Sequence, residues 1–345
     1  MAPAAFITGI STLTLTPEER AFLRDADPWG LILFARNVED PAQVSALTRS
    51  FRDVMGRNAP VFVDQEGGRV QRLRPPHWPA YPAGSAYGNL YDRDPEKGRR
   101  AAYLGARLIA SDLYAVGIDA DCLPLADVPV SGANPVIGDR AYGLIPAKVA
   151  LLAGDIGAGL LDGGVLPVLK HIPGHGRANA DSHAKLPVVD TDRATLEQTD
   201  FAAFRPLSDL PIAMTAHVVF SAIDPLAPAT TSATIIRHVI REFIGFGGLL
   251  MSDDVSMGAL SGSIRERTRA ALAAGCDIVL HCNGRMDEMQ EVAPTAGKLN
   301  GLAMRRAEDA LAQRRTPKDF DVAAARRQFA ELMQGDADSA SLMVS

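Results

Sequence analysis

Short apolar runs alternate with longer amphipathic stretches along most of this 345-residue sequence, and this alternation restricts the fold more than any other feature. Gly, Pro or Asp bounds each apolar run, as is typical of buried strands. Strands that alternate with helices indicate a parallel sheet. Eight runs are predicted strands: residues 5–9, 31–34, 61–64, 118–125, 165–170, 212–217, 249–253 and 276–281.

The stretches between these runs carry helix signals. Thr16 and Asp40 each precede a proline and are typical N-cap residues. Helices are predicted over residues 16–26, 40–55, 99–116, 231–246 and 261–276. We therefore predict an α/β fold, a (β/α)₈ TIM barrel that forms one catalytic domain over residues 1–345, with a polar tail from about residue 316. An open doubly wound sheet is the alternative, although no G-x-G-x-x-G follows the first strand.

Composition and charge exclude several classes of partner. The net charge is -6 and no basic stripe stands out, which argues against nucleic acid. No apolar run reaches the roughly 18 residues of a membrane span, and no secretory signal is recognised, so we expect a cytoplasmic protein. Cys122, Cys276 and Cys282 lie in apolar runs and are expected to be buried. Their spacing does not suit zinc, and we expect no metal or other cofactor.

Polar residues follow most of the predicted strands. In a parallel barrel the functional groups lie at the carboxyl ends of the strands, so these side chains are expected to share one pocket. A pocket rich in carboxylates, amines and imidazoles suits an uncharged, hydroxyl-rich ligand such as a sugar. A phosphorylated ligand held by Arg72, Arg140 and Lys170 is the alternative. The strand-end residues are Asp64, Glu66, Asp127, Lys170, His171, His217, Asp253, Asp254 and Asn283, with Arg140 on a loop.

Sugar hydrolysis needs a carboxylate that stabilises an oxocarbenium ion and a group that protonates the leaving oxygen. Asp253 follows an apolar strand and suits the first role. For Asp253, and more so for Asp254, the competing interpretation is an N-cap of the next helix. Glu66 is the nearest glutamate that could donate the proton, although its Gly-rich turn could instead direct it inward.

The segment KHIPGHGRANADSH, residues 170–183, offers another proton donor. His183 follows Asp181 by two residues, and a neighbouring carboxylate can fix the tautomer and basicity of an imidazole. A histidine that titrates near pH 7 can give and then take a proton. The Gly and Pro content of the segment predicts a loop that moves. The competing interpretation is a solvated loop whose histidines, His171 and His175 above all, only brace it.

Five motifs in this order resemble the single-domain bacterial β-N-acetylhexosaminidases of glycoside hydrolase family 3, the enzymes of peptidoglycan recycling. Ile172 stands where that family often has Phe. The resemblance spans roughly residues 29–283. The motifs are VDQEGGRVQRLR (63–74), IGDRAYG (137–143), LKHIPGHG…DSH (169–183), MTAHVVF (214–220) and LMSDDVSM (250–257).

The resemblance implies a retaining hydrolase with Asp253 as the nucleophile and His183 as the general acid/base, assisted by Asp181. It also implies a substrate in which N-acetylglucosamine is β-1,4-linked to 1,6-anhydro-N-acetylmuramic acid. The residues implied to bind the N-acetylglucosamine unit are Asp64, Arg72, Arg140, Lys170 and His171. The rival functions are a family 3 β-glucosidase or β-xylosidase, a β-N-acetylglucosaminide phosphorylase, and a non-catalytic barrel that binds muropeptides. The oligomeric state is left open.

Overall fold

The computed structural model describes residues 2–182 and 185–334, and its centre is a closed barrel of parallel strands. The strand order around the barrel is β1-β12-β11-β9-β7-β6-β3-β2. Each strand overlaps one predicted run, so the predicted (β/α)₈ barrel is confirmed. The barrel strands are β1 Ala4–Thr8, β2 Pro28–Leu33, β3 Val61–Val63, β6 Ala120–Asp121, β7 Leu166–Ile172, β9 Ile212–Thr215, β11 Leu249–Asp254 and β12 Ile278–His281.

Successive side chains of a strand point to opposite faces, and both faces of this barrel are apolar. In β7, Leu166 and Val168 pack inside the barrel with residues of the other strands. Leu169 belongs to the outer layer, which packs on the helices. Because each strand is buried on both sides, its sequence is a continuous apolar run and not an alternating one.

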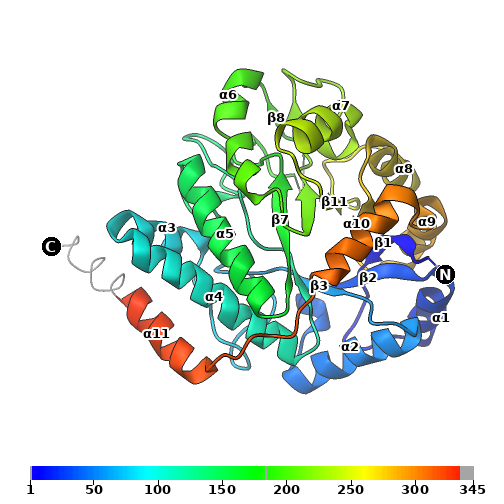
Figure 1. The fold of residues 1–345 in the computed structure, drawn as a ribbon. Helices are drawn as coiled ribbons and strands as arrows, with labels where there is room; N and C mark the ends of the chain where they lie inside the picture. Colours follow the sequence, from blue (N-terminus) through cyan, green and yellow to red (C-terminus); the bar gives the residue numbers. More distant parts are fainter. Residues whose placement is uncertain (1, 183–184, 335–345) are drawn as a thin grey trace.

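Helices surround the barrel, and Figure 1 shows them as an outer ring. No helix in the described part of the chain has both the length and the apolar character to cross a membrane. The helices are α1 Pro17–Ala26, α2 Pro41–Met55, α3 Gly84–Arg93, α4 Pro95–Ala115, α5 Pro146–Asp162, α6 Arg193–Gln198, α7 Ala233–Ile235, α8 Ile264–Ala274, α9 Met286–Ala296, α10 Gly301–Ala312 and α11 Val322–Gln334.

The two predicted N-caps hold at the residue level, whereas α4 begins at Pro95, four residues before its predicted start. Thr16 caps α1 and forms a capping box with Glu19, while the side chain of Asp40 caps α2. The helix predicted over residues 231–246 is irregular, because the single turn of α7 continues as a π-helix, η6 Ile236–Phe243. The helices α3, α5, α6, α9, α10 and α11 were not predicted.

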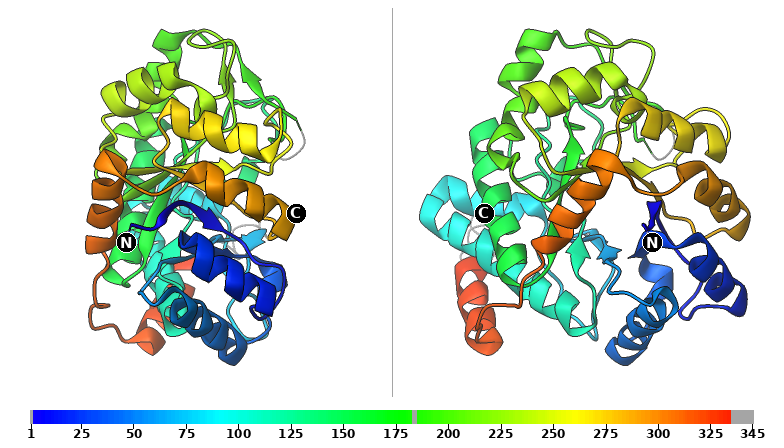
Figure 2. Two further views of the ribbon diagram at one scale, coloured as in Figure 1. Left: turned by 90° about the vertical axis from the view of Figure 1, so that its right-hand side faces the viewer. Right: turned by 45° about the vertical axis from the view of Figure 1, so that its right-hand side comes forward.

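The C-terminal part of the described chain covers two sides of the barrel. Helix α10 and the residues just after it lie where the strands begin, since Arg306 and Arg314 pair with Asp277 and Asp119, which directly precede β12 and β6. Figures 1 and 2 show the chain crossing from α10 (orange) to α11 (red), which packs beside α4 (cyan). The segment predicted as a polar tail thus contains a packed helix in the residues described up to 334.

Candidate active site

A cavity of about 350 Å³ opens at the carboxyl ends of the barrel strands. We call it the rim cavity. It brings together seven of the eight residues predicted for the site, while His183 lies outside the described residues. Asn283 and His217 do not border it. The predicted residues that do are Asp64, Arg72, Arg140, Lys170, His171, Asp181 and Asp253.

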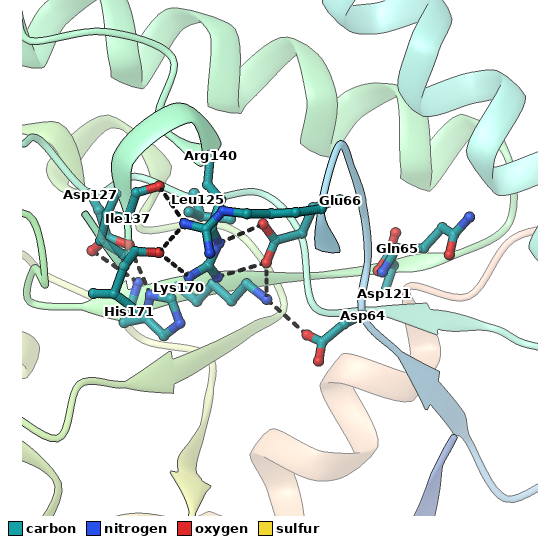
Figure 3. Close-up of polar contacts among 12 residues, drawn as sticks. Asp64, Gln65, Glu66, Asp121, Leu125, Asp127, Ile137, Arg140, Lys170 and His171 are labelled. Atoms are coloured by element: carbon teal, nitrogen blue, oxygen red, sulfur yellow. Dashed lines mark hydrogen bonds and ion pairs between the residues drawn. The ribbon is translucent and has the colours of Figure 1, made fainter. Parts of the chain in front are cut away.

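Five charged residues on one side of the rim cavity form a chain of ion pairs, which we call the charge network. The Lys170 Nζ lies 2.8 Å from Asp64 Oδ1 and 2.6 Å from Glu66 Oε1. Arg140 donates to both oxygens of Glu66, through Nε at 2.9 Å and Nη2 at 2.8 Å. Arg72 Nη2 donates to Asp64 Oδ2 at 2.9 Å. Figure 3 shows the Lys170 ammonium between the two carboxylates.

The charge network fixes the protonation of its members. Burial alone would raise the pKa of Asp64, but the charges of Lys170 and Arg72 hold that pKa well below its usual range. Burial opposes ionisation of Glu66 too, yet Lys170 and Arg140 lower its pKa. Its lowered pKa and the contacts at both oxygens favour the ionised form of Glu66, which argues against Glu66 as the proton donor. Its other predicted role, holding the loop from inside, agrees with these contacts.

A small hairpin brings Glu66 into the cavity. Strands β4 Gln65–Gly67 and β5 Val70–Gln71 pair in antiparallel fashion. Gln65 anchors the hairpin, because its Oε1 accepts from the backbone N–H groups of Arg72 and Leu73. The turn requires glycine at Gly67, where φ is +96° and a Cβ would lie 2.3 Å from the Pro82 carbonyl oxygen. The Gly-Gly pair of the EGG motif thus serves the placement of Glu66.

A one-turn helix, η2 Gly138–Arg140, carries Arg140. Helix α3 packs directly against it, since a Cβ at Gly84 would lie 2.0 Å from the Arg140 carbonyl oxygen. Arg69 holds the outside of the same loop by bonding to Asp139 and to the backbone carbonyl of Ile137. This packing fixes the guanidinium of Arg140 opposite Glu66.

Asp127 does not border the rim cavity but orients the histidine that does. Its carboxylate is fully buried, and Oδ2 lies 2.8 Å from His171 Nδ1. A carboxylate accepts hydrogen bonds, so Nδ1 of His171 carries the hydrogen and Nε2 is left for a ligand. Burial would raise the pKa of Asp127, but the His171 side chain lowers it. Figure 3 shows this pair beside the charge network.

Asp253 and Asp254 end β11, and their environments separate their roles. Both border the cavity, and Asp253 Oδ1 accepts from the Asp254 backbone N–H at 2.8 Å. The carboxylate of Asp254 accepts from the backbone of Ser256 and of Cys282. His217 Nε2 lies 3.0 Å from the Asp254 carbonyl oxygen, which fixes the same turn. Since Ser263 caps α8, the N-cap interpretation is wrong for both aspartates.

Some residues at the cavity were not predicted. Phe34 borders it directly after β2, and the guanidinium groups of Arg36 and Arg72 lie 5.0 and 5.4 Å from its ring centroid. Arg36 bonds to the carbonyl oxygens of Ile10 and Cys282, which ties the ends of β1 and β12 to β2. In the sequence, the polar pair Arg36-Asn37 after the apolar run was the signal that could have pointed to this strand end. Phe34 itself carried none, because in sequence it only extends the apolar run.

The chemistry of the cavity suits a neutral, polyhydroxylated ligand. Its ionised side chains offer fixed donors and acceptors, and each cation of the charge network already faces a carboxylate. Among residues 2–182 and 185–334, no group of three or more His, Cys, Asp or Glu side chains is arranged to hold a metal ion. Cys122, Cys276 and Cys282 are free and buried, as predicted.

Comparisons with known proteins agree with this geometry. Residues 9–315 match the family described as "Glycosyl hydrolase family 3 N terminal domain". A Beta-hexosaminidase of Alkalilimnicola ehrlichii is 42% identical over 279 residues, which cover 80% of this chain and 79% of the relative. A Beta-hexosaminidase of Bordetella avium is 38% identical over 287 residues, 82% of this chain and 81% of the relative.

Solved structures give the same result. NagZ from Neisseria gonorrhoeae in complex with N-trifluoroacetyl-D-glucosamine superposes with a TM-score of 0.81 at 33% identity, covering 96% of this chain and 99% of that one. Beta-N-acetylhexosaminidase from Beutenbergia cavernae has a TM-score of 0.74 at 28% identity, with 96% of each chain covered.

Proposed function

Because the chain belongs to glycosyl hydrolase family 3, with Beta-hexosaminidases among its relatives, we propose that it is a retaining exo-β-N-acetylglucosaminidase. Its proposed substrate is N-acetylglucosamine β-1,4-linked to 1,6-anhydro-N-acetylmuramic acid, as found in muropeptides of cell-wall recycling. The complex of the Neisseria gonorrhoeae relative with an N-acylated glucosamine supports the sugar assignment. The three free cysteines suit a reducing compartment and support work in the cytoplasm.

The proposed reaction has two steps, and Asp253 is its nucleophile. Asp253 attacks the anomeric carbon while the bond to the leaving oxygen breaks and His183 gives that oxygen its proton. His183 then takes a proton from water, whose oxygen attacks the anomeric carbon and releases Asp253. Asp181 is proposed to assist His183. The residues proposed to hold the sugar are Asp64, Arg72, Arg140, Lys170 and His171.

The observation that carries this proposal is the arrangement of ion pairs around the rim cavity. Asp64 and Glu66 are held as anions by their cations, so neither supplies a proton at neutral pH. Burial and the charge of His171 lower the pKa of His175 to about 4, so that ring does not carry the additional proton at neutral pH. These restrictions favour a separate proton donor, and His183 follows the cavity residues Asp181 and Ser182 in sequence.

The experiment is turnover of aryl β-N-acetylglucosaminides by the wild type and Asp253→Ala. Loss of the nucleophile should reduce kcat by at least about 10³-fold, because covalent catalysis splits one difficult step into two easier ones. Proton NMR of the first product should show the β-anomer. A variant with a near-normal rate would refute the nucleophile assignment, and an initial α-anomer would refute retention.

Substrate specificity is tested with matched glycosides. Aryl β-glucosides and β-xylosides should be turned over much more slowly than the N-acetylglucosaminide. Added phosphate should neither raise the rate nor give a sugar phosphate. Cleavage of the disaccharide with 1,6-anhydro-N-acetylmuramic acid, with and without a stem peptide, tests the natural substrate directly.

A further inference from the structure

The loop that follows β7 folds back on itself through one side-chain contact. His175 Nε2 lies 3.0 Å from the Ser182 hydroxyl, and both residues are almost completely buried. The proposed site assigns neither of them a role. His175 itself is anchored, because its backbone N–H donates to Asp127 Oδ1 at 2.7 Å. A Cβ at the next residue, Gly176, would lie 2.1 Å from the Val128 carbonyl oxygen, so the first half of the loop is packed tightly.

Ser182 is held on its other side by the chain that follows the proposed nucleophile. Its carbonyl oxygen accepts from the Ala259 backbone N–H at 3.2 Å. Ala259 lies five residues beyond Asp254, at the end of the turn that starts at β11. Ser182 therefore links the β7 loop to the β11 loop. In sequence it stands between Asp181 and His183, the two residues proposed to move the proton.

We propose that the contact between His175 and Ser182 is a positioning device, which holds the Asp181–Ser182 segment at the rim cavity and so determines how well His183 acts as acid and base. The inference rests on the proposed function. His175 and Ser182 are positioning residues in it, because they act through Asp181 and His183. The tightly packed first half of the loop holds His175 in place. The hydrogen bond between His175 and the Ser182 hydroxyl then holds the second half of the loop.

The His175 ring depends on this contact for its hydrogen bonding. Within the described residues its Nδ1 is buried and has no partner, so the Ser182 hydroxyl is the one hydrogen-bond partner of the ring. A neutral imidazole has one donor and one acceptor nitrogen, and a hydroxyl can accept from the first or donate to the second. Removing the hydroxyl would leave the whole buried ring unsatisfied and free the segment from its side-chain anchor.

The test measures kcat/KM of Ser182→Ala on aryl β-N-acetylglucosaminides with good and poor leaving groups. A misplaced acid matters most when the leaving oxygen needs a proton. We expect a loss of about 10- to 100-fold with poor leaving groups, within the usual worth of general acid catalysis, and less than about 3-fold with 2,4-dinitrophenolate. Ser182→Thr keeps the hydroxyl and should restore most of the rate.

Azide gives a second readout that a loss of folding would not produce. With the dinitrophenyl substrate, the glycosyl-enzyme should accumulate in Ser182→Ala because water lacks its base. Azide is already anionic, so its nitrogen attacks the anomeric carbon and displaces Asp253 without proton transfer. We expect azide to raise kcat and to give the β-glycosyl azide, as it should for His183→Ala. His175→Gln, which keeps a polar group near Nε2, should lie between Ser182→Ala and the wild type.

Ser131→Ala is the matched control, since Ser131 is exposed on an adjoining loop and does not border the rim cavity. It should behave as the wild type. Wild-type kinetics of Ser182→Ala, or an equal loss with every leaving group and no azide rescue, would overturn the positioning role while the proposed function stands. If His183→Ala itself shows no dependence on the leaving group, the acid/base assignment fails, and the inference fails with it.

Discussion

Glu66→Gln should destabilise the protein strongly, because Glu66 is the centre of the buried part of the charge network. Its side chain is 5% exposed and faces two cations, Arg140 at 10% and Lys170 at 3%. Glutamine keeps one acceptor oxygen but turns an NH₂ group toward the other cation. Removing one partner of a buried pair costs about 3–5 kcal/mol. Lys170 retains Asp64 and Arg140 retains the Val136 carbonyl, so we expect about 3 kcal/mol, the lower end.

The assay is urea unfolding at pH 7, followed by circular dichroism. The matched control is Asp139→Asn, which removes an ion pair to Arg69 from the same loop, with side chains 53% and 47% exposed. Exposed pairs contribute little, so the control should change the free energy of unfolding by less than about 1 kcal/mol. A loss below about 1 kcal/mol in Glu66→Gln would refute the reasoning. So would a stable variant whose kcat falls only with poor leaving groups, because that is the signature of a proton donor.

The free energy of unfolding should also depend on pH in a direction that follows from the pKa of Glu66. The pKa of Glu66 is lowered from 4.5 in the folded protein, so the unfolded chain binds the proton more readily. Stability from this ionised group is present above pH 4.5 and is lost as the pH falls through the folded pKa. The difference in unfolding free energy between the wild type and Glu66→Gln should therefore shrink on acidification below pH 4.5.

Two further predictions concern the loops beside the cavity. The pKa of His175 is lowered from 6.5 to about 4, so the wild type should lose up to about 3 kcal/mol of stability as the pH falls from 6.5 to 4, and His175→Asn should flatten that part of the urea-unfolding profile. Asp254→Asn keeps one oxygen for the backbone of Ser256 and Cys282, so its kcat should fall far less than that of Asp254→Ala. Equal kcat values for the two variants would show that the Asp254 carboxylate does not position the turn at Asp253.

The sequence predicted the barrel and the position of the site because both follow from local patterns. Each strand contains a continuous apolar run, and its polar residues begin near its carboxyl end, as at Lys170 and Asp253. A parallel barrel then places these ends together without any further information. What the sequence could not provide is the pairing within the rim, because the partners are far apart in the chain. Lys170 meets Asp64 across 106 positions.

The sequence also could not distinguish the role of Asp253 from that of Asp254. Both are acidic and adjacent, and their spacing alone allowed either one to cap the next helix. Both border the rim cavity, but their carboxylates meet different neighbours. Asp254 reaches the backbone of Cys282 at the end of β12, which is 28 positions away, whereas the N-cap role falls to Ser263. Likewise, Asp127 holds His171 from behind the cavity, and nothing in the sequence distinguished it from a residue inside.

The pairing of charges in the rim cavity bears on whether water or phosphate accepts the glycosyl group. Each basic side chain of the charge network that borders the rim cavity faces a carboxylate, and the positive charge that a phosphate ion needs is therefore already neutralised. An incoming phosphate would displace carboxylates from buried cations and would also approach Asp253 and Asp181. A water molecule or a sugar hydroxyl meets no such cost, because fixed dipoles and ion pairs bind neutral groups without reorganisation. The same network that argues against Glu66 as the proton donor thus favours water over phosphate as the acceptor of the glycosyl group.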